Sequence, residues 1–112
     1  MLYSFLKECD KMVKHVILWT LKDEFSESEK KQIKKEMKEE LEALVGKVPG
    51  LIDMKIYTNG LETSKNAEVM LDSTLESFEA LKAYAIHPEH VKVADEKVRP
   101  YTASRSCLDF EI

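Results

Sequence analysis

The first regular pattern in the chain is the run from Met12 to Leu21, in which apolar side chains fall on both faces of a β-strand. One face would carry Val13, His15, Ile17, Trp19 and Leu21, and the other Lys14, Val16, Leu18 and Thr20. A strand that is largely apolar on both faces is typically covered on both sides. We therefore expect a strand over residues 12–21 that is buried from two directions.

The next pattern predicts a charged helix with one apolar stripe. Ser26 and Glu29 have the spacing of a capping box, in which each side chain bonds the backbone amide of the other residue. The stripe recurs at intervals of three or four residues and consists of Ile33, Met37, Leu41, Leu44 and Val48. Gly46 marks the expected end of the helix, and Pro49-Gly50 separates it from the next element.

Two further strands are predicted, over residues 51–59 and 67–72, with a polar loop that begins at Asn59-Gly60. In the first we expect Ile52, Met54 and Ile56 on one face and Tyr57 on the other; in the second, Ala67, Val69 and Leu71 alternate with Glu68, Met70 and Asp72. Two strands joined in this way form an antiparallel pair with a long connection.

The last third of the chain predicts a helix, a shorter helix and a strand. Thr74 is expected to cap the first helix, and Pro88 to end it. Its inward residues would be Leu75, Phe78, Leu81 and Ala85. A helical piece over residues 89–98 stops before Pro100, and a strand follows over residues 102–112. On that strand Leu108, Phe110 and Ile112 share one face, and Cys107, Asp109 and Glu111 the other.

The predicted order is β-α-β-β-α-β, so the fold class is α+β, a ferredoxin-like four-stranded antiparallel sheet. The split βαβ rule places the first and third strands at its centre and both helices on one face. Nothing remains in a chain of 112 residues to cover the other face. Because the first strand is apolar on both faces, we expect a second copy of the chain to cover it, which makes the protein a homodimer.

Composition limits the class of partner. The chain has 44% hydrophobic and 34% charged residues and a net charge of −4, which indicates a globular domain and argues against a nucleic-acid or anionic-membrane partner. We expect no signal peptide, because Glu8 and Asp10 interrupt the N-terminus, and no membrane helix, which needs about 20 apolar residues.

Cys9 and Cys107 have no metal-binding spacing. The favoured interpretation is two free thiols in the cytoplasm, and a disulfide between them is the alternative. Residues 1–11 lack a clear period and are expected to be an N-terminal extension, disordered or non-native, that contributes little to the core.

Five segments resemble the stress-responsive α/β-barrel (Dabb) family: residues 14–22, 48–51, 75–81, 84–91 and 107–110. The resemblance covers residues 12–112. It implies a dimeric α+β barrel, in which two four-stranded sheets pack together and the helices lie outside. Few members have an assigned chemistry; plant polyketide cyclases, which close a ring by an intramolecular aldol-type reaction, are the ones with a defined reaction.

The resemblance also implies a site. In cyclase-like members the tyrosine and the second histidine of the Tyr…His-Pro-x-His segment, here Tyr84 and His90, carry proton transfers. A histidine titrates near neutrality and can remove a proton next to a carbonyl, and a tyrosine hydroxyl can stabilise the enolate that forms. Ligand contacts are expected from His15, Trp19 on the same strand face, and His87. Those members carry a further histidine on the third strand, which this chain lacks.

Structural roles stay open for each of these residues. His87 and His90 could cap helix ends, His15 could be a buried histidine with satisfied hydrogen bonds, and Tyr84 and Trp19 could be core residues. A metal held by His15, His87 and His90 is considered but not adopted, because Pro88 disturbs the helical spacing. No metal and no cofactor are therefore predicted.

Whether the protein is an enzyme is left open. The first hypothesis is a homodimer that binds a small, mostly apolar molecule between sheet and helices, with acid–base chemistry by His90 and Tyr84. The second is a non-catalytic stress protein whose function is the stable dimer. The third is a quinol or haem monooxygenase.

Overall fold

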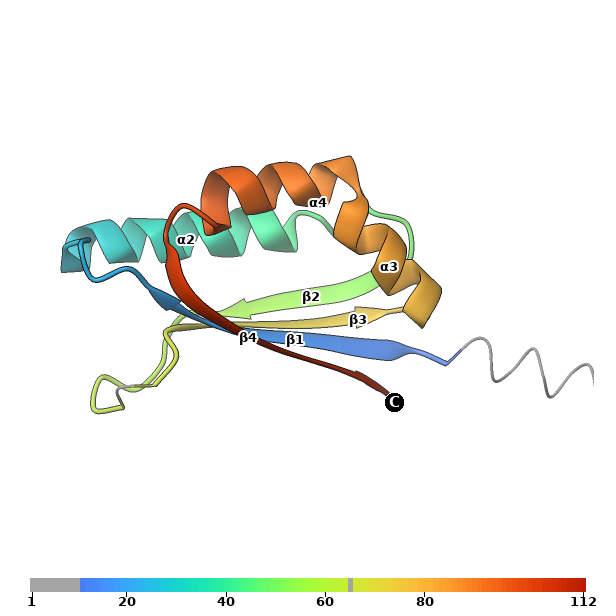
Figure 1. The fold of residues 1–112 in the computed structure, drawn as a ribbon, viewed down its shortest axis with the longest axis horizontal. Helices are drawn as coiled ribbons and strands as arrows, with labels where there is room; N and C mark the ends of the chain where they lie inside the picture. Colours follow the sequence, from blue (N-terminus) through green and yellow to red (C-terminus); the bar gives the residue numbers. More distant parts are fainter. Residues whose placement is uncertain (1–10, 65) are drawn as a thin grey trace, which may run out of the picture.

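The computed structural model describes residues 11–64 and 66–112 and shows one antiparallel sheet with helices on one of its faces (Figure 1). Its elements are β1 (Val13–Leu21), α2 (Glu27–Glu42), β2 (Leu51–Tyr57), β3 (Val69–Leu75), α3 (Phe78–Ile86), α4 (Pro88–Val93), a π-helical turn η1 (Ala94–Val98) and β4 (Thr102–Glu111). The strand order is β2-β3-β1-β4. The predicted ferredoxin-like fold, with the first and third strands central, is confirmed. The predicted extension lies outside the described residues except for Lys11, and Cys9 lies outside them as well.

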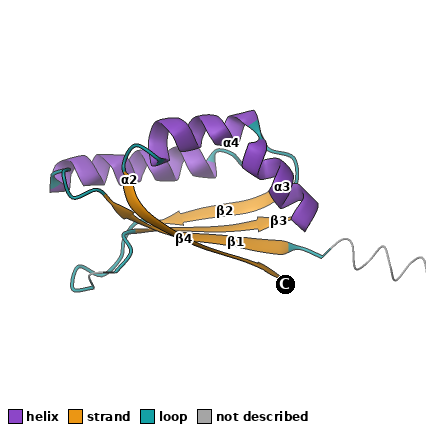
Figure 2. Ribbon diagram, in the orientation of Figure 1, coloured by secondary structure: helices purple, strands orange, loops and turns teal. Residues whose placement is uncertain are grey.

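The helices α2, α3 and α4 cover the same face of the sheet, which we call the inner face (Figure 2). The core lies between them, where α2 contributes Ile33, Met37 and Leu41 and the central strands contribute the buried side chains Val13, Ile17, Trp19, Leu21, Val69, Leu71 and Leu75. Within the described part of the chain, no helix has the length and apolar character needed to cross a membrane. The core is therefore enclosed by the inner face of the sheet on one side and by the helices on the other.

The predicted capping box at the start of α2 is confirmed. The Ser26 hydroxyl accepts a hydrogen bond from the Glu29 amide at 3.2 Å, and the Ser26 amide donates to the Glu29 carboxylate at 2.8 Å. The other end of α2 covers the edge of β2: the Glu42 carboxylate accepts from the Ile56 amide and the Lys38 ammonium donates to the Ile56 carbonyl, both at 2.9 Å. An edge strand is thereby protected from pairing with other chains.

The predicted face of Ile52 is wrong. The register between β2 and β3 shifts between Leu51 and Asp53, so Leu51 joins Met54 and Ile56 on the inner face while Ile52 is 45% exposed. A bulge of this kind inserts one residue and reverses the alternation on one side of it. The strict alternation assumed from the sequence could not include it.

The predicted start of the second helix is also wrong. Thr74 and Leu75 continue β3, where they pair with β1, and Leu75 is fully buried. Ser77 caps α3 instead, with its hydroxyl accepting from the Ala80 amide at 3.1 Å. Phe78, expected to point inward, is 57% exposed. Pairing partners on both sides of β3 therefore outweigh the local capping signal of Thr74.

The outer face of the sheet, opposite the helices, carries exposed apolar side chains: Leu18, Tyr57, Leu108 and Phe110. On β1 and β2, Leu18 and Tyr57 follow buried inner-face residues, whereas on β4 every residue from Ala103 to Glu111 is exposed. The strand register also joins them, because Leu18 and Tyr57 both pair with Met70, and Leu108 pairs with Val16. This surface is the one that the sequence predicted to need a second cover.

Candidate active site

A cavity of about 290 Å³ lies between the inner face of the sheet and the helices. Its wall is mostly apolar and is formed by His15, Ile17, Trp19, Leu41, Leu71, Leu81, Tyr84, Ala85, His90, Ala94, Val98, Arg99, Thr102 and Arg105. Apolar walls with a few convergent polar groups are typical of small-molecule sites. Every element except β2 contributes to it, so the cavity depends on the whole fold.

The junction between α3 and α4 positions Tyr84 and His90. In a continuous helix, residues six apart point about 120° away from each other around the axis. Here the chain breaks at His87, whose backbone is extended (φ −65°, ψ 132°), and Pro88 begins α4. The Tyr84 and His90 rings then lie together, with centroids 4.2 Å apart and an interplanar angle of 35°. The proline is therefore part of how the pair forms.

The hydrogen bond of His90 selects the tautomer that its neutral ring adopts. Its Nδ1 lies 3.1 Å from the Ala85 carbonyl, which can only accept, so Nδ1 carries the proton and Nε2 keeps a free lone pair. Burial lowers the pKa of His90, and the positive charges of Arg99 and Arg105 act in the same direction. The ring is therefore neutral near pH 7 and has one nitrogen available as a base.

Tyr84 has the complementary property. The side chain is 2% exposed, and burial raises the pKa of its hydroxyl far above the ordinary value. The hydroxyl therefore keeps its proton and can donate a hydrogen bond, as an enolate oxygen requires. The His15 ring packs edge-on against Tyr84, with centroids 6.0 Å apart.

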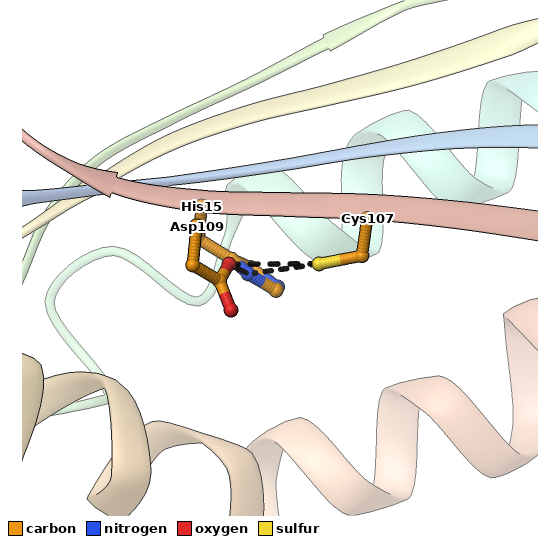
Figure 3. Close-up of side chains that lie close together, drawn as sticks. All are labelled: His15, Cys107 and Asp109. Atoms are coloured by element: carbon orange, nitrogen blue, oxygen red, sulfur yellow. Dashed lines mark hydrogen bonds and ion pairs between the residues drawn. The ribbon is translucent and has the colours of Figure 1, made fainter.

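His15 is buried on β1 and contacts two side chains of β4 (Figure 3). Its Nδ1 lies 2.5 Å from the Asp109 carboxylate and 3.6 Å from the Cys107 sulfur. Cys107 is exposed, but partial desolvation of its thiol, followed by the charge of Asp109, raises the pKa of that thiol, so this cysteine is not poised as a nucleophile. On the other side, the Ser73 hydroxyl donates to the His15 carbonyl at 2.8 Å.

Of the five residues predicted for the site, His15, Trp19, Tyr84 and His90 line one cavity, and His87 does not. The His87 ring accepts from the Glu89 amide at 3.1 Å and caps the start of α4, and it is not among the residues that line the cavity. His87 therefore has the helix-capping role that the sequence left open for it, and the group that it caps is a backbone amide. The three-histidine metal site considered from the sequence is not formed either, because His87 faces its own helix start.

Sequence reasoning missed four polar residues around the cavity. Arg99 and Arg105 line it, and Cys107 and Asp109 reach His15 from β4. The alternation along β4 did indicate that Cys107 and Asp109 share one face of that strand. Its meaning depended on the antiparallel register that sets Asp109 opposite His15 and Cys107 opposite Ile17.

The antiparallel sheet, the covering helices and the cavity define a ferredoxin-like α+β protein. The model of the stress responsive A/B barrel domain (Dabb) matches residues 13–112, and the chain therefore belongs to that family. Olivetolic acid cyclase of Cannabis sativa is 34% identical over 87 residues, which are 74% of this chain and 80% of that protein.

Solved structures extend the comparison. A dimeric protein of unknown function with a ferredoxin-like fold from Bacteroides fragilis has a TM-score of 0.82 and 32% identity, covering 90% of this chain and 96% of that one. The hydroxynitrile lyase of Passiflora edulis has a TM-score of 0.71 and 18% identity, covering 92% and 94%, and this likeness shows the fold alone. Proteins with different names thus share this architecture.

Proposed function

We propose that the protein is a homodimeric acid–base catalyst that binds a small, mostly apolar carbonyl compound in its cavity and closes a ring within it. The observation that carries the proposal is the close approach of the Tyr84 and His90 rings in an apolar cavity, where burial raises the pKa of the Tyr84 hydroxyl and lowers the pKa of His90. The resemblance of the chain to olivetolic acid cyclase supports the class of reaction.

The proposed reaction is an intramolecular aldol-type closure. Nε2 of His90 removes a proton from the carbon next to a carbonyl, and the enolate oxygen accepts a hydrogen bond from the Tyr84 hydroxyl. The enolate carbon then attacks a second carbonyl of the same molecule, forming the new C–C bond. The resulting alkoxide recovers the proton from the His90 imidazolium, so the catalyst returns to its starting state.

The other cavity residues would select the substrate. Trp19 and His15 lie on the inner face of β1 and would contact the molecule, while Arg99 and Arg105 favour one that carries a negative group at one end. A cavity of about 290 Å³ admits only a small ligand. His87 has no part in this proposal.

The homodimer is the second part of the proposal. Leu108 is 64% exposed and Phe110 42% exposed on the outer face of β4, and Leu108 pairs with Val16, which shares this face of β1 with Leu18. Contiguous apolar patches of this kind mark interaction surfaces. The related protein from Bacteroides fragilis is dimeric, which supports a second copy as the cover. The cytoplasmic location, without a nucleic-acid or membrane partner, remains part of the proposal as the sequence predicted it.

Ring-closure assays on linear polyketides, with product analysis by mass spectrometry, test the chemistry. We expect His90→Ala to lower kcat by about 10²–10⁴-fold and Tyr84→Phe by about 10²-fold, since these are the usual contributions of a general base and of an oxyanion donor. His87→Asn is the matched control, because asparagine keeps the helix cap, and it should leave the rate unchanged.

Two results would redirect the proposal. An unchanged rate for His90→Ala would remove this residue from the mechanism. A protein that closes no ring and binds no ligand, yet remains a stable dimer, would support the non-catalytic function instead, and a spectral change on adding haem would favour the monooxygenase.

A further inference from the structure

Three metal-ligating side chains meet beside the cavity: His15 from β1, and Cys107 and Asp109 from β4 (Figure 3). Their donor atoms all lie within 4.8 Å of one another. The antiparallel register makes this possible, because Asp109 pairs with His15 and Cys107 pairs with Ile17, all on the inner face. We call this group the His15 cluster.

We propose that the His15 cluster is a binding site for a divalent transition-metal ion, with zinc as its preferred occupant. Imidazole nitrogen, thiolate sulfur and carboxylate oxygen are the donors that zinc takes in proteins. Calcium and magnesium are disfavoured here, because both ions require mainly oxygen ligands. The proposal concerns a binding site and does not depend on the ring-closing function.

The distances suit such an ion. Zinc–ligand bonds of about 2.0–2.3 Å in tetrahedral geometry place neighbouring ligand atoms roughly 3.3–3.7 Å apart. The Cys107 sulfur is 3.6 Å from His15 Nδ1 and 3.5 Å from the Asp109 carboxylate oxygen. The third pair, His15 Nδ1 and Asp109, is 2.5 Å apart because a hydrogen bond joins it. A metal ion that replaces the proton between them would increase the distance between these two atoms by about 1 Å.

All three ligands lie on the paired strands β1 and β4. His15 lies in a central strand, and the Ser73 hydroxyl donates to its carbonyl, so the backbone that carries the imidazole is held by β1 and β3 together. Cys107 and Asp109 are two residues apart on β4, so their side chains leave the same face. Three protein ligands leave a fourth position open, and His15 lines the cavity, so that position can hold water or a ligand oxygen.

The test uses full-length protein with Cys9→Ser, so that Cys107 is the only thiol present. After chelator treatment and dialysis, titration calorimetry with Zn²⁺ should show one ion per chain. Co²⁺ should produce visible bands of a tetrahedral site and a thiolate-to-cobalt charge-transfer band. Cys107→Ser and Asp109→Asn should each weaken zinc binding by about 100-fold or more, because even residues that only support a ligand cost 10–100-fold.

Two matched controls should bind as before. Glu111→Gln removes a carboxylate two residues further along the same face of β4, and His87→Asn removes an imidazole outside the cluster. Equal zinc affinity in Cys107→Ser and its parent, or cobalt spectra without a thiolate band, would overturn the proposal. Cys107 is exposed, so its substitution is compatible with folding, which circular dichroism verifies before each titration.

Discussion

The two faces of β1 are both apolar, yet the chain covers only one of them. On the inner face Ile17 and Trp19 are 5% and 4% exposed beneath the helices, whereas Leu18, between them on the outer face, is 42% exposed. The inner face also carries the polar residue His15, which is buried together with its hydrogen-bond partners. The difference shows that the chain covers the face that carries its candidate site and leaves the outer face of β1 partly exposed.

Polar groups distinguish the faces more sharply than apolar groups do. Burying a polar side chain is unfavourable unless its hydrogen bonds are met, so those on the inner face need partners. His15, Ser73 and His90 all have them. Substitutions on the two faces should therefore affect different properties: those on the outer face should change dimer formation, and those on the inner side should change the free energy of unfolding and its dependence on pH.

The largest expected effect is the loss of the dimer when a charged side chain is introduced on the outer face. Leu108→Glu would place a carboxylate in the proposed interface of both copies, where its desolvation is not compensated. We expect the dimer to be lost at micromolar concentration, measured by sedimentation velocity, with the circular dichroism spectrum unchanged.

Leu61→Glu is the control for this change, because Leu61 is 78% exposed in the loop before β3 and should tolerate the charge. A wild-type protein that sediments as a monomer at the same concentration would contradict the proposed dimer itself.

The second largest expected effect is a loss of stability when a buried side chain on the inner face is shortened. Leu75→Ala should destabilise the fold by about 2–5 kcal/mol, because the side chain is fully buried and the cavity left behind cannot close completely. Urea unfolding monitored by fluorescence of Trp19 measures it. Leu61→Ala should change the free energy of unfolding by less than about 0.5 kcal/mol, and similar losses for both variants would mean that Leu75 is not the core position described here.

The same contrast explains what the sequence could predict. The capping box of Ser26 and Glu29 is a local signal, fully contained in four residues, and the structure confirms it. The order of elements and the central place of the first and third strands follow from hydrophobic periodicity and the split βαβ rule, and they are confirmed as well.

The errors concern properties set by distant pairing. Ile52 lies beside a bulge that only the β2–β3 register reveals, and Thr74 is drawn into β3 by β1. The contact of Asp109 with His15 likewise depends on the β1–β4 register, which brings together two residues that are 94 positions apart in the sequence. Pattern reasoning thus found the side chains that share a strand or a motif, but not those brought together by a sheet.

A smaller effect is expected from the buried hydroxyl of Ser73. Ser73→Ala removes the donor to the His15 carbonyl and should cost about 1 kcal/mol, the usual net value of one hydrogen bond. Thr63→Ala, which removes an exposed hydroxyl in the loop before β3, is the control and should have no measurable effect. Equal urea midpoints for the two variants would show that the Ser73 bond contributes nothing.

The smallest effect is a pH dependence that arises from His90. Because burial lowers the pKa of this histidine in the folded chain, the folded state binds its proton less readily than the unfolded state, whose pKa is about 6.5. The contribution of the neutral His90 to stability is therefore fully present above about pH 6.5, and it is lost as the pH falls from there through the lower pKa of the folded state. His15, Arg99 and Arg105 act in the same direction by repelling the proton, whereas the Ala85 carbonyl opposes them.

Carboxylates whose pKa is lowered in the folded protein, such as Glu36 and Glu42, lose their contribution only below about pH 4.5, so they do not obscure this window. Urea midpoints measured between pH 5 and pH 8 should fall on the acid side for the wild type and for His87→Asn. The fall should be smaller in His90→Gln, which cannot take up the proton. An identical decline in His90→Gln would mean that another inner-face group is responsible, and the neutral base required by the proposed reaction would lose its support.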